Sequence, residues 1–448
     1  MRVRFWGTRG SIASPGPATV HFGGNTSCVE VVTNAGKRFI FDCGTGARAL
    51  GMHLLATAPK PLSATIFLGH SHWDHIQGFP FFAPLFIPGN EFTICAPEGV
   101  GGSSLGEVLA GQMEFTYFPV ELAQLPAKIS FRELREGVHD IDGVRVITQF
   151  LNHPTTTLGY RIEADGVALL YLTDHEPFSE SIWRADAQPG ELSSILHAGD
   201  RRHAEFMLGA DFVIHDSQYT PEEYSAKKNW GHSTYIYVVE MASAAHAKRV
   251  ALFHHDPLHD DAKLTLIERR AKSLAALRRN DLTVFCAYEG CDINITPSGP
   301  RMTSVSVAEP EAPKREGKLR VLVVDDDPNV RLLAKVALGK EYIVLEAENG
   351  QQCMANLDEM APDLILLDLN MPMMGGLEVL EILRSRQGYA SLPVLVLTAS
   401  GDESNTRAGF EAGATDYLTK PFTIPQLATR VHACFARNIA DPVKPEPL

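Results

Sequence analysis

The sequence predicts two α/β domains, a layered α/β sandwich followed by a doubly wound parallel sheet of five βα repeats. In the first 300 residues, short β-like runs such as CVEVV, RFIFD and ATIFL alternate with turns and a few helical stretches. Several runs are apolar throughout, as strands covered on both faces are. After residue 318 the alternation of β-like and helical stretches becomes regular, which is typical of a parallel sheet with helices on both faces.

Length and composition place the boundary between these domains. A chain of 448 residues exceeds what one hydrophobic core usually supports. Residues 301–317 are rich in Ala, Pro, Glu, Ser and Lys and have few large apolar side chains, which is typical of a linker. We therefore expect domains at 1–300 and 318–438, a linker at 301–317, and a disordered tail at 439–448.

Charge and cysteine usage exclude several classes of protein. The formal net charge of −14 disfavours long nucleic acid as a partner. The N-terminus lacks the apolar stretch of a signal peptide, and no run approaches the roughly 20 apolar residues of a membrane span, so we expect a cytoplasmic protein without membrane contact.

Seven scattered cysteines indicate reduced thiols. Cys286 and Cys291 could form a metal clip, but their spacing favours buried small residues.

Four potential metal ligands follow the strand-like run ATIFL. They are His70, His72, Asp74 and His75, within six residues. Alternate residues of an extended chain share a side, so His70 and His72 can hold one ion while Asp74 and His75 face another.

Further candidate ligands stand where other apolar runs end. They are His153, Asp174 and His254. Strand ends converge on one edge of a sandwich, where a rigid scaffold can hold loop ligands around a metal. His175 adjoins Asp174 and His255 adjoins His254, so either neighbour could be the ligand; the family pattern discussed next favours Asp174 and His254.

The HxHxDH motif, followed by a separated His, Asp and His, resembles the metallo-β-lactamase superfamily over residues 1–297. The resemblance implies an αββα sandwich and a binuclear site. One metal would take His70, His72 and His153; the other would take Asp74, His75 and His254; Asp174 would bridge them. Zn²⁺ is the expected metal, although Mn²⁺ and Fe²⁺ suit the same ligands. Asp74 would also orient the nucleophile.

Three further segments resemble the ribonuclease Z and phosphodiesterase branch of that superfamily. They are FWGTRGS at residues 5–11, GGNTS at residues 23–27 and WGHST at residues 230–234. The resemblance implies that His232 contacts the scissile phosphate or protonates the leaving oxygen; alternatively, His232 caps a helix that starts at Ser233. Asp216 would orient His232 or a ligand; alternatively, it is an exposed carboxylate at a strand end.

The expected substrate is a small phosphodiester such as a cyclic nucleotide. The chain has no convincing equivalent of the Gly/Pro-rich arm with which ribonuclease Z holds transfer RNA, and its acidic balance points the same way. Aromatic residues just past the metal motif could form a wall against which a base stacks, or could belong to the core. They are Trp73, Phe79, Phe81, Phe82 and Phe86.

In the second domain, polar residues stand at the carboxyl ends of successive strand-like runs, where parallel sheets place ligands. Clustered carboxylates bind Mg²⁺, and one of them can accept a phosphoryl group. The pattern resembles response-regulator receivers from 318 to 438; these acidic strand ends disfavour a flavodoxin-like cofactor domain. The resemblance implies Asp368 as phosphoacceptor, Mg²⁺ at Asp325, Asp326, Asp368 and the Asn370 carbonyl, phosphoryl contacts from Thr398 and Lys420, and Tyr417 as an aromatic switch. Asp327 is expected to be a neighbour of the site.

Together the domains predict a metal-dependent phosphodiesterase regulated by receiver phosphorylation, with a sensor histidine kinase or phosphotransfer protein as partner and possible homodimerisation. Hydrolysis of a carboxylic ester, lactone or thioester is an alternative, because the HxHxDH set is shared among those branches. A non-enzymatic ligand-binding module is another. A histidine in the WGHST segment favours the phosphodiesterase.

Overall fold

The computed structural model describes residues 1–98, 104–184, 189–278, 281–297, 318–386, 388–399 and 412–438. The chain folds into two units, Met1–Ser306 and Val307–Leu448. The expected linker at 301–317 and the expected tail at 439–448 lie outside the described residues. Each unit has hydrophobic cores of its own and is described separately below.

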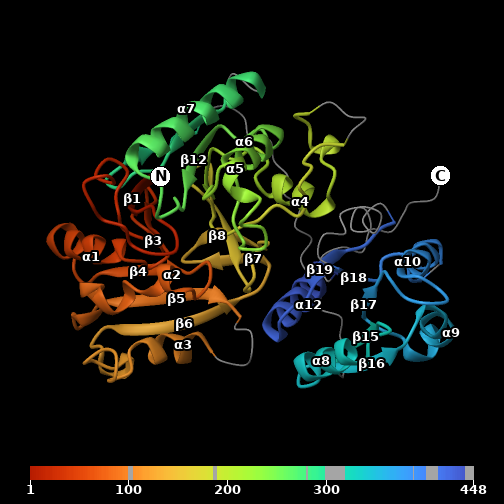
Figure 1. Cartoon of the computed structure of the whole chain (residues 1–448). Coiled ribbons are helices and arrows are strands. Elements are labelled where there is room, and N and C mark those ends of the chain that lie inside the picture. Colours follow the sequence, from red (N-terminus) through yellow and green to blue (C-terminus); the bar gives the residue numbers. More distant parts are fainter. Residues whose placement is uncertain are drawn as a thin grey trace. The chain divides into compact units, whose positions relative to one another are not determined.

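The N-terminal unit contains two seven-stranded sheets that enclose an apolar core (Figure 1). The first sheet has the order β14 (Asp292–Asn294), β1 (Arg2–Gly7), β2 (Cys28–Val32), β3 (Arg38–Phe41), β4 (Ser63–Phe67), β5 (Glu91–Pro97) and β6 (Lys128–Leu134). The second has the order β13 (Thr283–Cys286), β12 (Arg249–Phe253), β11 (Phe212–Asp216), β10 (Val167–Leu172), β9 (Leu158–Ala164), β8 (Val144–Phe150) and β7 (Gly137–Ile141).

Aromatic side chains fill the space between the two sheets. Phe41 of β3 stacks on Tyr171 of β10 with ring centroids 4.9 Å apart, and Phe67 of β4 packs against Tyr160 of β9 at 4.9 Å. All six residues of β10 are buried, as expected for a strand covered on both faces. This packing brings the ends of β4, β8, β10 and β12 to one edge of the sandwich.

Helices cover the outer faces of both sheets. The first sheet carries α1 (Gly46–Thr57), α2 (Trp73–Ile76), α3 (Leu105–Gln112), η1 (Phe79–Phe81), η2 (Ala83–Phe86) and η3 (Leu122–Gln124). The segments with the second sheet are η4 (Leu192–Ser194), α4 (Ala198–Phe206), α5 (Pro221–Tyr224), α6 (Tyr235–Ala244) and α7 (Asp261–Arg278). Local signals set some helix starts: Ser104 and Glu107 form a capping box at α3, and Thr234 caps α6. The expected αββα sandwich is confirmed.

The C-terminal unit is a five-stranded parallel sheet with an apolar core on each face. Its order is β16 (Ile343–Ala347), β15 (Arg320–Val324), β17 (Leu364–Asp368), β18 (Val394–Ala399) and β19 (Asp416–Lys420). The described helices are α8 (Pro328–Leu338), α9 (Gly350–Met360), α10 (Gly376–Ser385) and α12 (Ile424–Asn438). The expected fourth helix, between β18 and β19, falls at 400–411, outside the described residues. The doubly wound class is confirmed.

Two further properties concern the whole chain. All seven cysteines are free and buried, so Cys286 and Cys291 pack as small core residues. Among the described residues, no helix combines the length and the apolar character needed to cross a membrane.

Candidate metal centre and phosphoacceptor site

The seven expected metal ligands of the N-terminal unit lie at one edge of the sandwich. His70 follows β4, and the chain then turns into α2, where His72 is the N-cap and Asp74 and His75 are helical. The other three follow the ends of β8, β10 and β12 within three residues: they are His153, Asp174 and His254. Six of the seven are buried and His72 is exposed.

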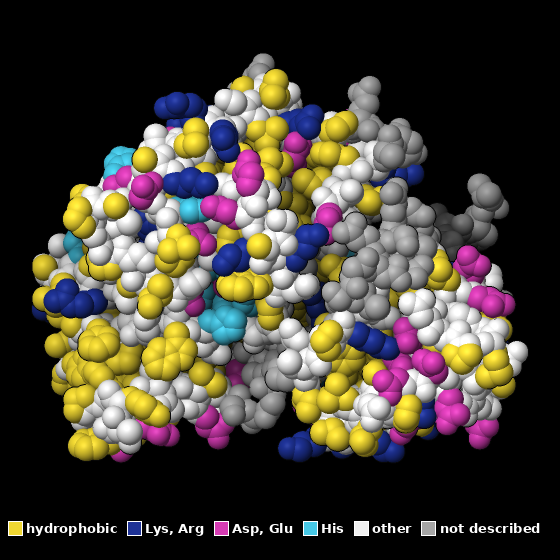
Figure 2. Space-filling model, viewed as in Figure 1, with side chains coloured by type: hydrophobic (Ala, Val, Ile, Leu, Met, Phe, Trp, Pro, Cys, Tyr) yellow, Lys and Arg dark blue, Asp and Glu magenta, His cyan; other side chains and the backbone are white. Residues whose placement is uncertain are grey.

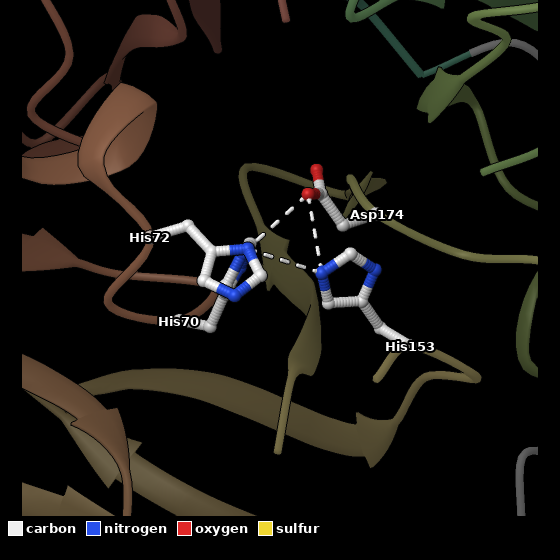
Figure 3. A group of neighbouring side chains, drawn as sticks. All are labelled: His70, His72, His153 and Asp174. Atoms are coloured by element: carbon white, nitrogen blue, oxygen red, sulfur yellow. Dashed lines mark hydrogen bonds and ion pairs between the residues drawn. The ribbon is translucent and has the colours of Figure 1, made fainter. Parts of the chain in front are cut away.

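One group of these side chains surrounds the Asp174 carboxylate (Figure 3). Asp174 Oδ2 lies 3.5 Å from His70 Nε2 and 3.7 Å from His153 Nε2. His153 Nε2 in turn lies 3.3 Å from His72 Nδ1. Three imidazoles from two separate segments therefore converge with one carboxylate, a donor set that suits a transition metal such as zinc.

A second group shares the same carboxylate. Asp74 Oδ2 lies 3.3 Å from His75 Nε2 and 3.1 Å from His254 Nε2. Asp174 reaches this group as well: Oδ2 lies 3.3 Å from His75 Nε2, and Oδ1 lies 3.2 Å from His254 Nε2. Asp174 thus stands between two ligand groups, as a bridging carboxylate would.

The backbone at this edge is strained. Asp174 and His254 have φ values of 62° and 58°, and Asp42, at the end of β3, has 57°. These values lie in the left-handed region that non-glycine residues rarely adopt, and such strain persists only where the surrounding structure imposes it. Two glycines allow the close packing: a Cβ on Gly10 would lie 2.4 Å from the His254 ring, and one on Gly231 would lie 2.0 Å from His153 Nδ1.

The C-terminal unit gathers carboxylates at the ends of its central strands. Asp325, Asp326 and Asp368 are close enough to share one ion. Lys420 Nζ donates to Asp325 Oδ2 at 2.6 Å and to Asp368 Oδ2 at 2.8 Å. Burial alone lowers the pKa of Lys420, but these two bonds outweigh it and raise the pKa above its usual value. Burial raises the pKa of Asp325.

The remaining expected residues of this unit stand around that cluster. Asn370 N donates to Asp368 Oδ1 at 3.2 Å. Thr398, on β18, is buried, and Tyr417, on β19, is half-buried. Asp327 instead accepts from Asn329 N as the N-cap of α8, which explains its place in the sequence without a role at the ion.

Comparison with known families assigns both units. The profile of the "Beta-lactamase superfamily domain" family matches residues 37–255, and that of the "Response regulator receiver domain" family matches residues 321–432. The chain joins a β-lactamase superfamily domain to a response regulator receiver domain. This is the pair of families that the sequence motifs resemble.

Individual relatives match one domain at a time. The transcriptional regulatory protein ResD of Bacillus subtilis is 43% identical over 119 residues, which are 26% of this chain and 48% of ResD. The chain therefore spans about half the length of the curated relatives it matches. The chemotaxis response regulator CheY4 of Vibrio cholerae is 30% identical, with 26% of this chain and 99% of that chain covered and a TM-score of 0.26. Human tRNase Z, short form, is 20% identical, with 66% and 99% covered and a TM-score of 0.43.

In the β-lactamase superfamily domain, His232 adjoins the candidate metal centre. Its Nδ1 lies 3.0 Å from Asp216 Oδ2, and its ring stacks near His254 at a centroid distance of 5.0 Å. Burial alone lowers the pKa of His232, but the Asp216 carboxylate outweighs it, and the pKa is raised to about 9. Asp216 is fully buried, which excludes an exposed carboxylate. Thr234 caps α6, so the cap is not His232.

Other contacts orient the ligand rings, and sequence reasoning did not identify them. His75 Nδ1 lies 2.6 Å from Asp42 Oδ2, which also accepts from Tyr171 Oη at 2.7 Å. His254 Nδ1 lies 3.0 Å from Gln218 Oε1. Because an amide oxygen only accepts, His254 carries its proton on Nδ1 and turns Nε2 toward the carboxylates. Such outer partners fix the orientation of metal-ligating histidines.

Several ring nitrogens in the cluster have no partner other than the ligand group itself. In the described part of the chain, His70 Nδ1 and Nε2 and His75 Nε2 are buried without a hydrogen bond. Burial holds the pKa of His70 well below its usual range, which favours the neutral form that binds metal. A buried imidazole such as that of His70, whose two ring nitrogens form no hydrogen bond, fits a metal better than it fits any contact within the protein.

The neighbours of two ligands have other contacts. His255 Nε2 lies 2.8 Å from the Ala287 carbonyl oxygen, and His255 belongs to neither ligand group. His175 belongs to a separate buried network: its Nε2 lies 3.1 Å from Tyr237 Oη, and its ring stacks on His203 at 3.7 Å. No sequence motif signalled this network, because these three members come from three separate segments.

The aromatic residues beyond the metal motif divide between core and surface. Phe79 and Phe82 are fully buried in the core under the first sheet, so of the two alternatives they follow the core one. Phe86 packs partly against the same core. Trp73 and Phe81 are exposed. Figure 2 shows histidine atoms at the surface of the N-terminal unit, with hydrophobic side chains beside some of them.

Proposed function

We propose that the β-lactamase superfamily domain is a binuclear metal-dependent phosphodiesterase that acts on a cyclic nucleotide or another small phosphodiester. The observation that carries this proposal is the His232–Asp216 pair beside the ligand cluster. One atom from each of His232, Asp174 and His254 lies within 4.8 Å of the others. A proton donor at this distance suits the departure of an alkoxide, the difficult step of phosphodiester cleavage.

The proposed ligands follow the two observed groups. His70, His72 and His153 would hold one ion and Asp74, His75 and His254 the other, with Asp174 between them. Zinc fits this donor set best. When bound, such a pair of ions supplies hydroxide near neutral pH and stabilises the attacking and leaving oxygens.

The protein's own side chains would complete the reaction. Asp216 accepts from Nδ1 of His232, so Nε2 is the nitrogen left to face the substrate. We assign to that atom the delivery of a proton to the leaving oxygen. Asp74 accepts from Ser11 N at 2.7 Å, and this bond holds the carboxylate where it can orient the nucleophile.

Turnover of bis-p-nitrophenyl phosphate by metal-analysed protein tests the proposal. Wild-type protein should hydrolyse it with Zn²⁺, Mn²⁺ or Fe²⁺ and lose activity when the metal is chelated. His232→Ala should lower kcat by a factor on the order of a hundred or more, with metal content unchanged. His139→Ala, a histidine on β7, serves as the control.

Three results would contradict this assignment. Absence of phosphodiester turnover with any of the three metals would exclude the phosphodiesterase. Lactone or thioester hydrolysis that does not depend on His232 would instead support the carbon-ester alternative. Metal-loaded protein that is inert toward all these esters but binds a nucleotide tightly would support a ligand-binding module.

For the receiver domain we propose phosphorylation at Asp368 by a histidine kinase or phosphotransfer protein. Mg²⁺ would be held by Asp325, Asp326, Asp368 and the Asn370 carbonyl. Lys420 already contacts the acceptor carboxylate, and Thr398 and Tyr417 would respond to the phosphoryl group. We propose that this modification regulates the phosphodiesterase.

A further inference from the structure

Residues 224–231 form the segment that leads into His232, and one buried carboxylate anchors this segment. Glu176 accepts hydrogen bonds from Tyr224 Oη at 2.9 Å, from Asn229 N at 2.7 Å and from Gly231 N at 2.8 Å. The Gly231 carbonyl oxygen lies 3.0 Å from His153 Nδ1. This segment is therefore fixed to the metal centre at its C-terminal end.

A lysine ammonium of this segment lies over aromatic rings. Lys227 Nζ is 4.1 Å from the centroid of the Trp230 ring and 5.9 Å from that of Tyr219. The Tyr219 ring in turn meets the His232 ring edge to face, with centroids 5.8 Å apart. Two ring contacts therefore link the ammonium to the proposed proton donor.

The charge on Lys227 has no carboxylate partner within the described ranges, whereas its neighbour Lys228 pairs with Glu180. A cation–π contact positions an ammonium but leaves its charge un-neutralised, so an anion can still bind it. Glu176, which anchors the segment, is engaged by hydroxyl and backbone donors. In a protein with a formal charge of −14, a positioned and uncompensated cation beside the active site favours an anionic ligand.

We propose that Lys227 is a specificity-determining residue that binds a second anionic group of the substrate, beyond the scissile phosphate. The substrate class is then a phosphodiester that carries a further phosphate or comparable anion. Trp230 and Tyr219 hold the ammonium, and Glu176 holds the segment. This inference rests on the proposed phosphodiesterase activity and narrows its substrate.

Two chromogenic substrates test the inference in the full chain. One is the p-nitrophenyl ester of thymidine monophosphate; the other is the same ester with an added phosphate on the free sugar hydroxyl. Wild-type protein should prefer the doubly phosphorylated ester in kcat/KM. Lys227→Met should reduce that preference roughly tenfold, through KM, and Lys227→Arg should restore it. Lys228→Met, the neighbouring and paired lysine, should keep the preference.

Equal preference in wild type and Lys227→Met, or no preference in wild type, would overturn the inference. If neither ester is cleaved, the proposed phosphodiesterase activity is wrong, and a binding measurement then tests the role of Lys227 independently of turnover. Calorimetric affinity of the metal-loaded protein for thymidine bisphosphate should fall roughly tenfold in Lys227→Met, while affinity for thymidine monophosphate changes less. Equal losses for both nucleotides would contradict the role of Lys227.

Discussion

At the scale of single residues, Gln218 decides which nitrogen of His254 faces the candidate metal centre. It accepts from His254 Nδ1 through Oε1 at 3.0 Å, and its Nε2 donates to Ser11 Oγ at 3.2 Å. Gln218→Met removes the acceptor at similar size. We expect metal affinity at the Asp74, His75 and His254 position to fall roughly ten- to hundredfold, as for other outer partners of metal-ligating histidines.

Competition with a chromogenic chelator measures this affinity. In Gln218→Met the two metal ions should bind with different affinities, because only one of the two ligand groups loses an orienting contact. Gln124→Met, which alters an exposed glutamine, controls for the substitution. If both equivalents bind as in wild type, Gln218 does not orient the ligand.

The sequence predicted the site residues that stand close together in a motif. It did not predict those whose partners lie far away along the chain. The HxHxDH ligands are visible because four donor side chains fall within six residues. Asp42 and Gln218 carry no such signal. Asp42 meets Tyr171 across 129 residues of chain, and only the packing of the two sheets brings them together. The choice between His254 and His255 also depends on the turn after β12, where φ of His254 is positive.

At the scale of elements, a buried carboxyl joins α4 to α6. Asp200 of α4 accepts from Tyr237 Oη of α6 at 2.7 Å and from Phe178 N at 3.0 Å. Burial raises the pKa of Asp200 from 3.8 to about 7. The folded protein therefore keeps this proton while the unfolded chain releases it, so rising pH favours unfolding through this group.

Asp200→Asn, which cannot ionise, isolates that contribution. Relative to the variant, the wild type should lose stability between about pH 4 and about pH 7 and change little above that range, by on the order of a few kcal/mol in total. Urea denaturation across this range measures the difference. A difference that does not vary with pH would mean that Asp200 is ionised in the folded protein.

The sequence predicted the positions of the strands more accurately than it predicted the directions in which individual side chains point. The strand-like runs correspond to β2, β3 and β4, because continuous apolar runs bounded by turns have few other structures open to them. The aromatic residues after α2 lie in two short 3₁₀ helices. A turn of this kind points successive rings in different directions, so Phe79 enters the core while Phe81 is exposed.

At the scale of the whole molecule, the chain joins a β-lactamase superfamily domain to a receiver domain, and the proposed function makes the second the regulator of the first. The receiver domain has an acceptor carboxylate, Asp368, bound by Lys420 and close to Asp325. A phosphoryl group bonded to one carboxylate oxygen of Asp368, as an acyl phosphate, would add negative charge there and draw Lys420 toward itself. Because Lys420 ends β19, the change would reach Tyr417 on the same strand.

Phosphorylation should therefore change the activity of the other domain. With Mg²⁺ and acetyl phosphate, turnover of bis-p-nitrophenyl phosphate by the full chain should shift about fivefold or more, the lower end of typical coupling between sites. Asp368→Asn should abolish the response, and Glu359→Gln, an exposed acid on α9, should retain it. Association state measured in parallel separates dimerisation from direct control of the site. If phosphorylated protein matches the unmodified chain in both turnover and association, the receiver domain does not act through the phosphodiesterase.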